Sequence, residues 1–280
     1  MHRLIRSALV LGVTCFWAAM WGTQLRDHLI IGSAPVAKPD YGALLRSEET
    51  ERHETWRIYF SSFNVGKVDV DYRRQGDGSI RSTARMTVEP RVSVALGFAE
   101  GLSLQFTADL SPFSGLRSFE VFVGPHDPEA PCLAALQGEV HGDTIHVTGL
   151  IGSQKIDKTL PYAGDSVGVT ALSPTTATPS LDGPLGERWR VGVVDPLSGD
   201  ISYIEVSVVE RKRVAVWRED RLELVHKLCY IRGSSSWYGW VDDQGQALVQ
   251  GTPFGVVLRR EDLPAETVAA LDVGPGSGPR

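Results

Sequence analysis

The chain is poor in cysteine and has no excess of positive charge. Its 280 residues include 3 Cys, too few for a disulfide-rich scaffold or a multi-cysteine zinc module. Lys and Arg number 28 against 34 Asp and Glu, and this net charge of -6 argues against a general nucleic-acid binder, which carries a basic stripe. Charged residues make up 22% of the chain, close to the globular average, so wholesale disorder is excluded.

Familiar catalytic motifs are also missing. The sequence contains no Gly-x-Ser-x-Gly elbow, no Ser-x-x-Lys, no His-Glu-x-x-His and no phosphate-binding loop. Cys229 has His226 three residues earlier, but these two positions face opposite sides of a strand and cannot form a thiolate pair. We therefore expect a protein that is not an enzyme, and we predict no cofactor.

One long uncharged run is present near the N-terminus, Ser7 to Leu25. As a helix it reaches about 28 Å, close to the hydrocarbon thickness of a bilayer of about 30 Å. Arg3, Arg6 and the terminal amine outweigh the Arg26–Asp27 pair, which places the N-terminus in the cytoplasm. The run predicts a signal-anchor over residues 1–28, with the lipid bilayer as its partner through residues 7–25.

This anchor predicts a location for the rest of the chain. A single Asn and a strong preference for Arg over Lys are typical of a GC-rich bacterial genome. We therefore expect a single-pass protein of the bacterial inner (cytoplasmic) membrane, with its remaining residues periplasmic or extracellular. A cleaved signal peptide stays open as the alternative, although the apolar run exceeds the usual length of such a segment and no small-x-small cleavage site follows promptly.

Short strands separated by turns predict an all-β fold after the anchor. Residues 29–54 are interpreted as a linker, with Pro35 and Pro39 forbidding a continuous helix. From residue 55 to 264 we predict one antiparallel β domain, a curved sheet that forms a half-barrel or barrel-like structure. Its clearest signal is Val68, Val70 and Tyr72 alternating with charged residues. Only 92–100 and 265–271 are candidate helices, and we assign residues 265–280 to a disordered tail because their end is rich in Gly and Pro.

A tight hairpin around Gly142-Asp143 carries the best metal-like cluster. A two-residue turn there places Glu139, His141 and His146 on one face, and two His with one carboxylate match a zinc-ligand set. The solvent face of an ordinary hairpin has the same pattern. We therefore predict no metal and keep these three residues as the candidate ligands.

The remaining candidates are aromatic side chains and thiols. Trp189, Trp237, Tyr238 and Trp240 are candidates for lining an apolar ligand cavity, although aromatic residues in strands also form plain core. Cys132 and Cys229 lie outside the predicted membrane segment, and in an oxidising compartment they are a possible disulfide. Their spacing alone leaves both the paired and the free state open.

The C-terminal third resembles a known kind of protein. The segments Gly183-Pro-Leu-Gly-Glu-Arg-Trp-Arg-Val, Asp195-Pro-Leu-Ser-Gly, Ser236-Trp-Tyr-Gly-Trp-Val-Asp-Asp-Gln-Gly245 and Gly255-Val-Val-Leu-Arg259 are similar to bacterial envelope proteins of unknown function with a lipoprotein-carrier-like (LolA/LolB-type) β half-barrel. Val65-Gly66 before an alternating strand is similar to the start of that domain. The resemblance covers about residues 56–262 and implies a curved antiparallel sheet whose concave face holds an acyl chain, without a catalytic residue.

Two functions follow from these patterns. The first is a membrane-anchored extracytoplasmic β domain of the bacterial cell envelope that is non-enzymatic and has a structural or assembly role. The second is a carrier half-barrel that binds a lipid or another hydrophobic ligand. The corresponding partners are an envelope protein or an acyl chain, and nucleic acid is not expected.

Overall fold

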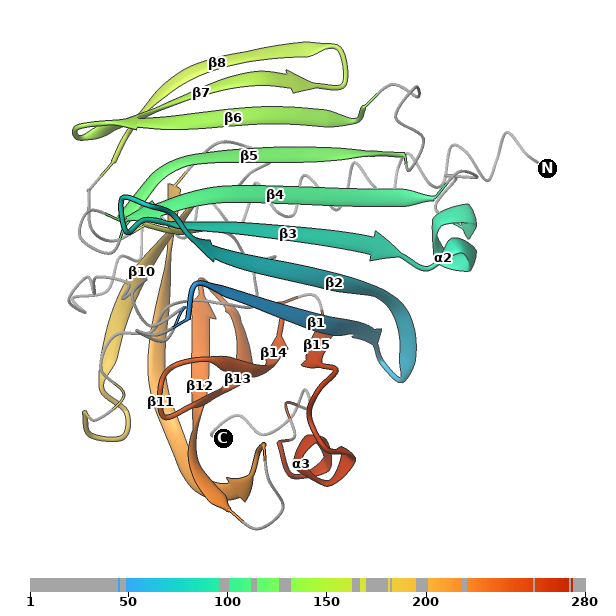
Figure 1. Ribbon diagram of the computed structural model, residues 1–280, viewed down its shortest axis with the longest axis vertical. Helices are drawn as coiled ribbons and strands as arrows, with labels where there is room; N and C mark the ends of the chain where they lie inside the picture. Colours follow the sequence, from blue (N-terminus) through green and yellow to red (C-terminus); the bar gives the residue numbers. More distant parts are fainter. Residues whose placement is uncertain are drawn as a thin grey trace.

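Alternating apolar and polar residues build one continuous sheet of fifteen strands in the computed structural model (Figure 1). The structure describes residues 45, 49–95, 101–111, 115–125, 132–162, 167–169, 181, 183–194, 201–217, 221–253, 255–271 and 273. The predicted all-β, antiparallel class is confirmed, because every neighbouring pair of strands is antiparallel except β9 and β10.

The first half of the sheet is a meander of eight strands with one short helix. Its elements are β1 (Glu51–Phe60), β2 (Phe63–Arg74), β3 (Ile80–Val88), α2 (Pro90–Ala95), β4 (Leu102–Ser111), β5 (Gly115–Pro125), β6 (Ala134–His141), β7 (Thr144–Ile151) and β8 (Gln154–Pro161). In β2 the alternation is as predicted, with Val68, Val70 and Tyr72 buried. Helix α2 overlaps the helix predicted at 92–100.

The second half contains the remaining strands and a C-terminal helix. These are β9 (Val167–Val169), β10 (Arg188–Val194), β11 (Ile201–Ala215), β12 (Leu222–Arg232), β13 (Ser235–Asp242), β14 (Ala247–Gly251), β15 (Val256–Arg260) and α3 (Ala265–Ala270). The strand order is β8-β7-β6-β5-β4-β3-β2-β1-β15-β14-β13-β12-β11-β10-β9. Strands β8 and β9 are therefore the two edges, and over the described residues the curved sheet does not close on itself.

The main core lies between the two halves of the sheet. Figure 1 shows the strands of the first half crossing those of the second at a steep angle. Trp56, Val70 and Phe119 from the first half and Val206 and Trp237 from the second belong to one cluster of buried side chains. Apolar residues on the inner face thus fill the space that the curved sheet surrounds.

A smaller core covers the outer side of β12 to β14 and corrects the predicted tail. Its members are Val216, Val225, Cys229, Tyr238, Trp240, Leu248, Val249, Leu263, Leu271 and Val273. Helix α3 is tied down because Thr267 donates to the carbonyl of Ala215 and Lys212 to that of Ala270. The candidate helix at 265–271 is confirmed as α3, whereas the assignment of residues 265–280 to a disordered tail is wrong for residues 265–271 and 273, since burial of Leu271 and Val273 stabilises this segment.

The predicted linker also ended too late. Strand β1 already begins at Glu51, which pairs with Arg73 of β2, and Leu45 is buried. Residues 51–54 therefore belong to the sheet. The predicted anchor at 7–25 lies outside the described residues; within the described ones, no helix is long and apolar enough to cross a membrane.

A buried ionic cluster joins the two halves of the sheet. Glu54 of β1 accepts a hydrogen bond from Arg260 of β15 at 3.2 Å and another from the indole nitrogen of Trp56 at 3.2 Å. Arg52 lies 3.1 Å from the same carboxylate. Arg260 also binds Asp262 through two hydrogen bonds of 3.0 and 2.7 Å. These contacts reinforce the pairing of β1 with β15, the only strands that link the two halves in the described sheet.

Candidate binding site

The outer face of β4 to β7 carries an unbroken row of polar side chains. The inner positions of these strands are apolar, so strand alternation turns the polar residues toward solvent. The register places Thr107 opposite Glu120, Glu120 opposite Gln137, and Gln137 opposite Thr148. Four neighbouring strands therefore each contribute one hydrogen-bonding side chain to the same row.

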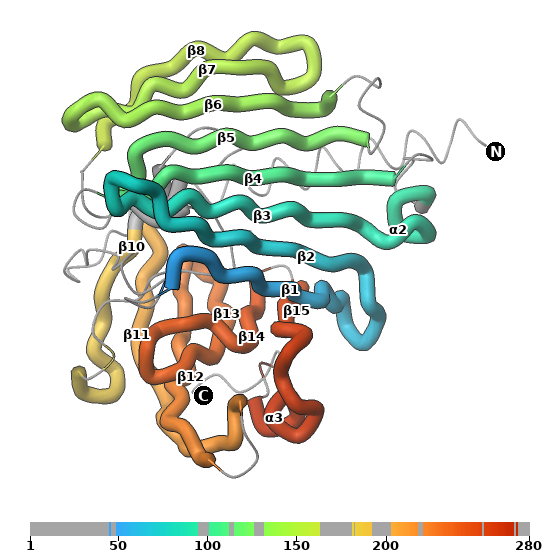
Figure 2. The backbone as a smooth tube through the Cα atoms, in the orientation of Figure 1, coloured from blue at the N-terminus to red at the C-terminus, as the bar shows by residue number. Residues whose placement is uncertain are grey.

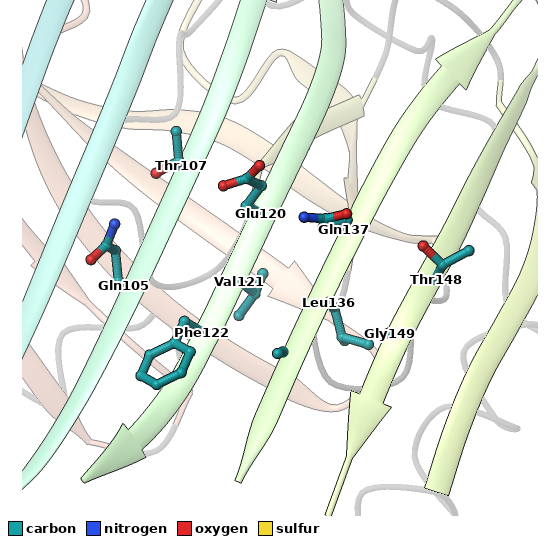
Figure 3. A pocket seen from close by; sticks show the side chains of 10 residues that line it. Gln105, Thr107, Glu120, Val121, Phe122, Leu136, Gln137, Thr148 and Gly149 are labelled. Atoms are coloured by element: carbon teal, nitrogen blue, oxygen red, sulfur yellow. The ribbon is translucent and has the colours of Figure 1, made fainter. Parts of the chain in front are cut away.

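In the adjacent row of outward-facing residues, one small side chain lies between two large ones. Phe122 lies opposite Ala135, and Ala135 lies opposite Leu150. Because the methyl group of Ala135 stands between two large side chains, the surface sinks at this point. The result is a hollow of about 270 Å³, drawn in Figure 3. Its walls are formed by Gln105, Thr107, Glu120, Val121, Phe122, Ala135, Leu136, Gln137, Thr148 and Gly149.

Gly149 brings two backbones together beneath the hollow. Its φ of 144° is one that residues with a side chain rarely adopt. A Cβ atom added there would lie 2.0 Å from the carbonyl oxygen of Ala135. This position therefore requires glycine, and the close approach of β6 and β7 depends on it.

The lining consists mainly of hydrogen-bonding groups. Gln105 and Gln137 each carry a donor and an acceptor, and Thr107 and Thr148 add hydroxyl groups. Glu120 is the only ionisable side chain among the residues that form the walls. The ring of Phe122 is 39% exposed and supplies one apolar surface. This combination suits a ligand that has both hydroxyl groups and an apolar face.

Charges next to the hollow are already paired. Arg81 donates two hydrogen bonds to Asp109 at 2.8 and 2.9 Å, and Ser118 donates to the same carboxylate. These hydrogen bonds from Arg81 lower the pKa of Asp109 below its ordinary value. Asp109 thus stays ionised and bound to its neighbours, which leaves Glu120 as the carboxylate that faces the hollow.

The four aromatic candidates do not share one cavity. Trp189 and Trp237 belong to the main core, whereas Tyr238 and Trp240 belong to the smaller core. All four are buried. Consecutive residues of β13 face opposite sides of the sheet, so Trp237 and Tyr238 cannot meet. Within the main core, the rings of Trp237 and Tyr230 stack at a centroid distance of 5.8 Å.

The hairpin cluster has the predicted register but not a metal-ligand geometry. Pairing of His141 with Thr144 confirms the two-residue turn, and Glu139 lies opposite His146. His141 is 3.4 Å from Glu139, but the ring of His146 turns to β8, 3.3 Å from Thr159 and 3.7 Å from Asp157. Over the described residues, no group of three or more His, Cys, Asp or Glu side chains is placed to hold a metal ion.

The two thiols are separate in the structure. Cys132 is half-buried, Cys229 is buried, and both are free, so the possible disulfide is not formed. Burial raises the pKa of Cys229, which favours the unreactive thiol. Cys229 lies in the smaller core, while Leu228 and Tyr230 on either side of it lie in the main core, as strand alternation predicts.

Sequence reasoning missed the hollow because its signal is not contiguous. Ala135 between Phe122 and Leu150 becomes visible only when the register of three strands is known. The alternation of each strand separately predicted an ordinary polar face.

Comparisons with known proteins identify no family for this chain. No family model matches it, and no curated protein matches it. Among solved structures, it is similar to a β-barrel-like protein of a domain of unknown function, DUF1849, from Brucella abortus. The two are 8% identical, the match covers 75% of this chain and 94% of that one, and the TM-score is 0.46.

Proposed function

We propose that this protein is a membrane-anchored, non-enzymatic binding protein of the bacterial cell envelope with a structural or assembly role. Residues 7–25 hold it in the inner membrane with the N-terminus in the cytoplasm, and the β domain lies on the periplasmic or extracellular side. The observation that carries the proposal is the hollow on the outer face of β4 to β7, with its polar walls and its one exposed ring.

The chemistry of the hollow favours a saccharide as ligand. The amide groups of Gln105 and Gln137 can each donate to one hydroxyl and accept from another. The Phe122 ring offers a surface for the C–H face of a sugar. Envelope glycans present these groups to a domain outside the cytoplasm. A hollow of about 270 Å³ is small for a drug-like ligand and suits one sugar unit of a longer chain.

A non-enzymatic role agrees with the same lining. Hydrolysis of a glycosidic bond generally uses two carboxyl groups on opposite sides of the bond. Glu120 is the single carboxylate in the walls of the hollow. The arrangement therefore supports binding without cleavage.

The filled interior favours this function over the lipid carrier. A carrier needs an open apolar cavity for its acyl chain. On the inner face, large side chains from both halves form one continuous core that includes the stacked Tyr230 and Trp237. An acyl chain in this part of the core would have to displace these residues.

Binding is tested with the full-length protein in detergent and an N-acetylglucosamine tetrasaccharide as the probe. Isothermal titration should detect binding, and Gln137→Ala should weaken it about three- to tenfold because one hydrogen-bonding group is removed. The matched control is Gln154→Ala, an exposed glutamine of β8 outside the hollow, which should leave the affinity unchanged. No binding by the unaltered protein, or equal losses in both variants, would refute the saccharide site.

Topology is tested separately in bacterial cells. Alkaline phosphatase fused after residue 270 is active only when it is exported, so we expect activity from the fusion. If this fusion is inactive while a reporter that works only in the cytoplasm is active at the same position, the proposed orientation is wrong.

A further inference from the structure

Large exposed apolar side chains gather at one end of the first half of the sheet. Phe60 and Phe63 flank the β1–β2 turn and are 55% and 72% exposed. Val94 of α2, Leu133 before β6 and Leu150 near the end of β7 are also exposed. We call these five residues the apolar rim.

Strand direction puts all five residues at the same end. The chain reverses there between β1 and β2, through α2 between β3 and β4, between β5 and β6, and between β7 and β8, on the right in Figure 2. Two backbone hydrogen bonds tie these turns to their neighbours: Glu89 donates to the carbonyl of Val65 at 2.9 Å, and Gly152 donates to that of Leu133 at 2.7 Å. The rim is therefore a property of the fold and not of one loop.

The opposite end of the same strands has a different character. Its described turns contain Gly76, Asp77 and Gly78 between β2 and β3, and Gly142 and Asp143 between β6 and β7. Among the described residues of β1 to β8 and their turns, every large apolar side chain that is exposed lies in the rim, except Phe122 in the hollow. Exposed apolar side chains that are restricted to one end of a domain, with Phe60 and Phe63 adjacent to each other, make that end a candidate for contact with a partner or a membrane.

We propose that the apolar rim rests on the lipid bilayer, with Phe60 and Phe63 inserted among the head groups. This inference rests on the proposed function, because it takes residues 7–25 as the membrane anchor. Segments that lie on a membrane surface bury Phe, Trp and Leu side chains at the boundary between head groups and acyl chains. A hairpin tip with two phenylalanines presents such rings without exposing unpaired backbone groups of the strands, since Phe60 and Phe63 face each other across the turn.

The length of chain between anchor and sheet permits this orientation. Strand β1 begins at Glu51, at the end opposite to the rim, and its ten residues extend about 33 Å. Because Leu45 is buried in the main core, residues 26–44 form the connection to the predicted anchor, and they can span about 60 Å when extended. The connection is thus long enough to pass the full length of β1 while the rim stays on the membrane. In this orientation the hollow, which lies on the face of the sheet, remains open to the side.

The test uses the full-length chain in vesicles of phosphatidylethanolamine and phosphatidylglycerol. A photoreactive benzoylphenylalanine replaces Phe63 or, in the control, Leu222, which is 59% exposed at the start of β12 in the second half. After illumination, mass spectrometry should find phospholipid adducts at position 63 at a yield about tenfold or more above that at position 222. The same probe at position 94 should also form phospholipid adducts. The double variant Phe60→Ser, Phe63→Ser should reduce the adduct yield at position 94.

The outcomes separate this inference from the proposed function. Alkaline carbonate washing first shows whether the chain is held by an integral anchor. Protein that stays with the vesicles but gives equal adducts at positions 63 and 222, or none, would overturn the rim contact alone. A cross-linked dimer in place of lipid adducts would assign the rim to a second copy of the chain and also overturn it. Protein released by the wash would overturn both proposals.

Discussion

Asp242 is a buried carboxyl group that closes a turn and that is harder to ionise than an exposed one. It is 2% exposed at the end of β13 and accepts hydrogen bonds from the backbone N–H groups of Gln244 at 3.0 Å and Gln246 at 2.8 Å. Burial, only partly offset by these hydrogen bonds, raises its pKa from 3.8 to about 6. Burial therefore favours the protonated carboxyl, whereas the two backbone hydrogen bonds favour the ionised carboxylate.

The raised pKa predicts a specific pH dependence. Below pH 3.8 this carboxyl is protonated in both the folded and the unfolded chain, and its contribution to stability is fully present. As the pH rises from 3.8 through about 6, the unfolded chain ionises while the folded chain still holds the proton on the buried carboxyl, so about 3 kcal/mol of stability is lost over this window. Asp242→Asn keeps an oxygen acceptor for the turn and does not titrate. The variant should therefore gain stability relative to the unaltered protein between pH 4 and pH 7.

Urea denaturation at several pH values measures this difference. Asp243→Asn is the matched control, because Asp243 is the exposed neighbour in the same turn. If the stability difference between Asp242→Asn and the unaltered protein stays constant from pH 4 to pH 7, the pKa of Asp242 is not raised.

At the scale of elements, the hairpin of β6 and β7 forms the floor and one wall of the hollow. Its turn needs Gly142, whose φ is 62°, and its far end needs Gly149, whose φ is 144°. The two glycines differ in their surroundings. A Cβ atom at Gly142 would meet nothing within 4 Å, whereas one at Gly149 would collide with the backbone of Ala135.

Alanine substitution should separate these two situations. Gly149→Ala adds a backbone collision to an unfavourable φ, so we expect a loss of about 2–4 kcal/mol and a displaced wall of the hollow. Gly142→Ala introduces no collision, and its unfavourable φ alone should lower the free energy of unfolding by about 1 kcal/mol. The free energies of unfolding from thermal or urea denaturation give the comparison. Equal losses in the two variants would mean that β6 and β7 do not approach as closely as the structure places them.

The elements also show what local pattern can and cannot predict. The alternation of Val68, Val70 and Tyr72 predicted which face of β2 is buried, since burial repeats every second residue in a strand. Gly142-Asp143 predicted the correct turn and register of one hairpin. Alternation could not predict the burial of β13, because both faces of this strand are covered from Trp237 to Asp242. Residues around α3, Leu263, Leu271 and Val273, join Tyr238 and Trp240 of β13 in the smaller core; the sequence predicted a candidate helix at 265–271 but not that this segment packs on the sheet.

The hollow could not be predicted for a related reason. It depends on Phe122, Ala135 and Leu150 being neighbours across three strands, and such pairing is a relation between elements. Periodicity tells which face a side chain takes, but it does not tell which residue lies beside it. The predicted ligand cavity of the aromatic candidates was wrong for the same reason. Their strands were predicted, but periodicity could not show that the four side chains belong to two separate cores.

At the scale of the whole molecule, the decisive contact joins residues far apart in the chain. Trp56 pairs with Arg260, and the carboxylate of Glu54 contacts the guanidinium of the same Arg260. Neither contact has a local signature, yet they connect a meander of eight strands to a second group of seven. The main core contains buried residues from both groups, so each half depends on the other to complete it, although the second half also contains the smaller core. The described sheet should therefore unfold as one unit.

Substitutions at Glu54 test this cooperativity. Glu54→Ala removes the carboxylate that Arg52, Trp56 and Arg260 share. Arg260 keeps Asp262 as its partner, but the largely buried Arg52 loses this carboxylate, and breaking such a buried cluster should cost about 3–5 kcal/mol. Glu54→Gln keeps an acceptor of the same shape and should lose less. Urea denaturation followed by tryptophan fluorescence and by far-ultraviolet circular dichroism should give one coincident transition for each protein, shifted to lower urea in the variants. Because the shared core holds the halves together, the slope of the transition should not change.

Two separate transitions in the unaltered protein would show that the halves fold independently. A single transition that splits only in Glu54→Ala would instead make this ionic cluster, and not the shared core, the contact that couples them.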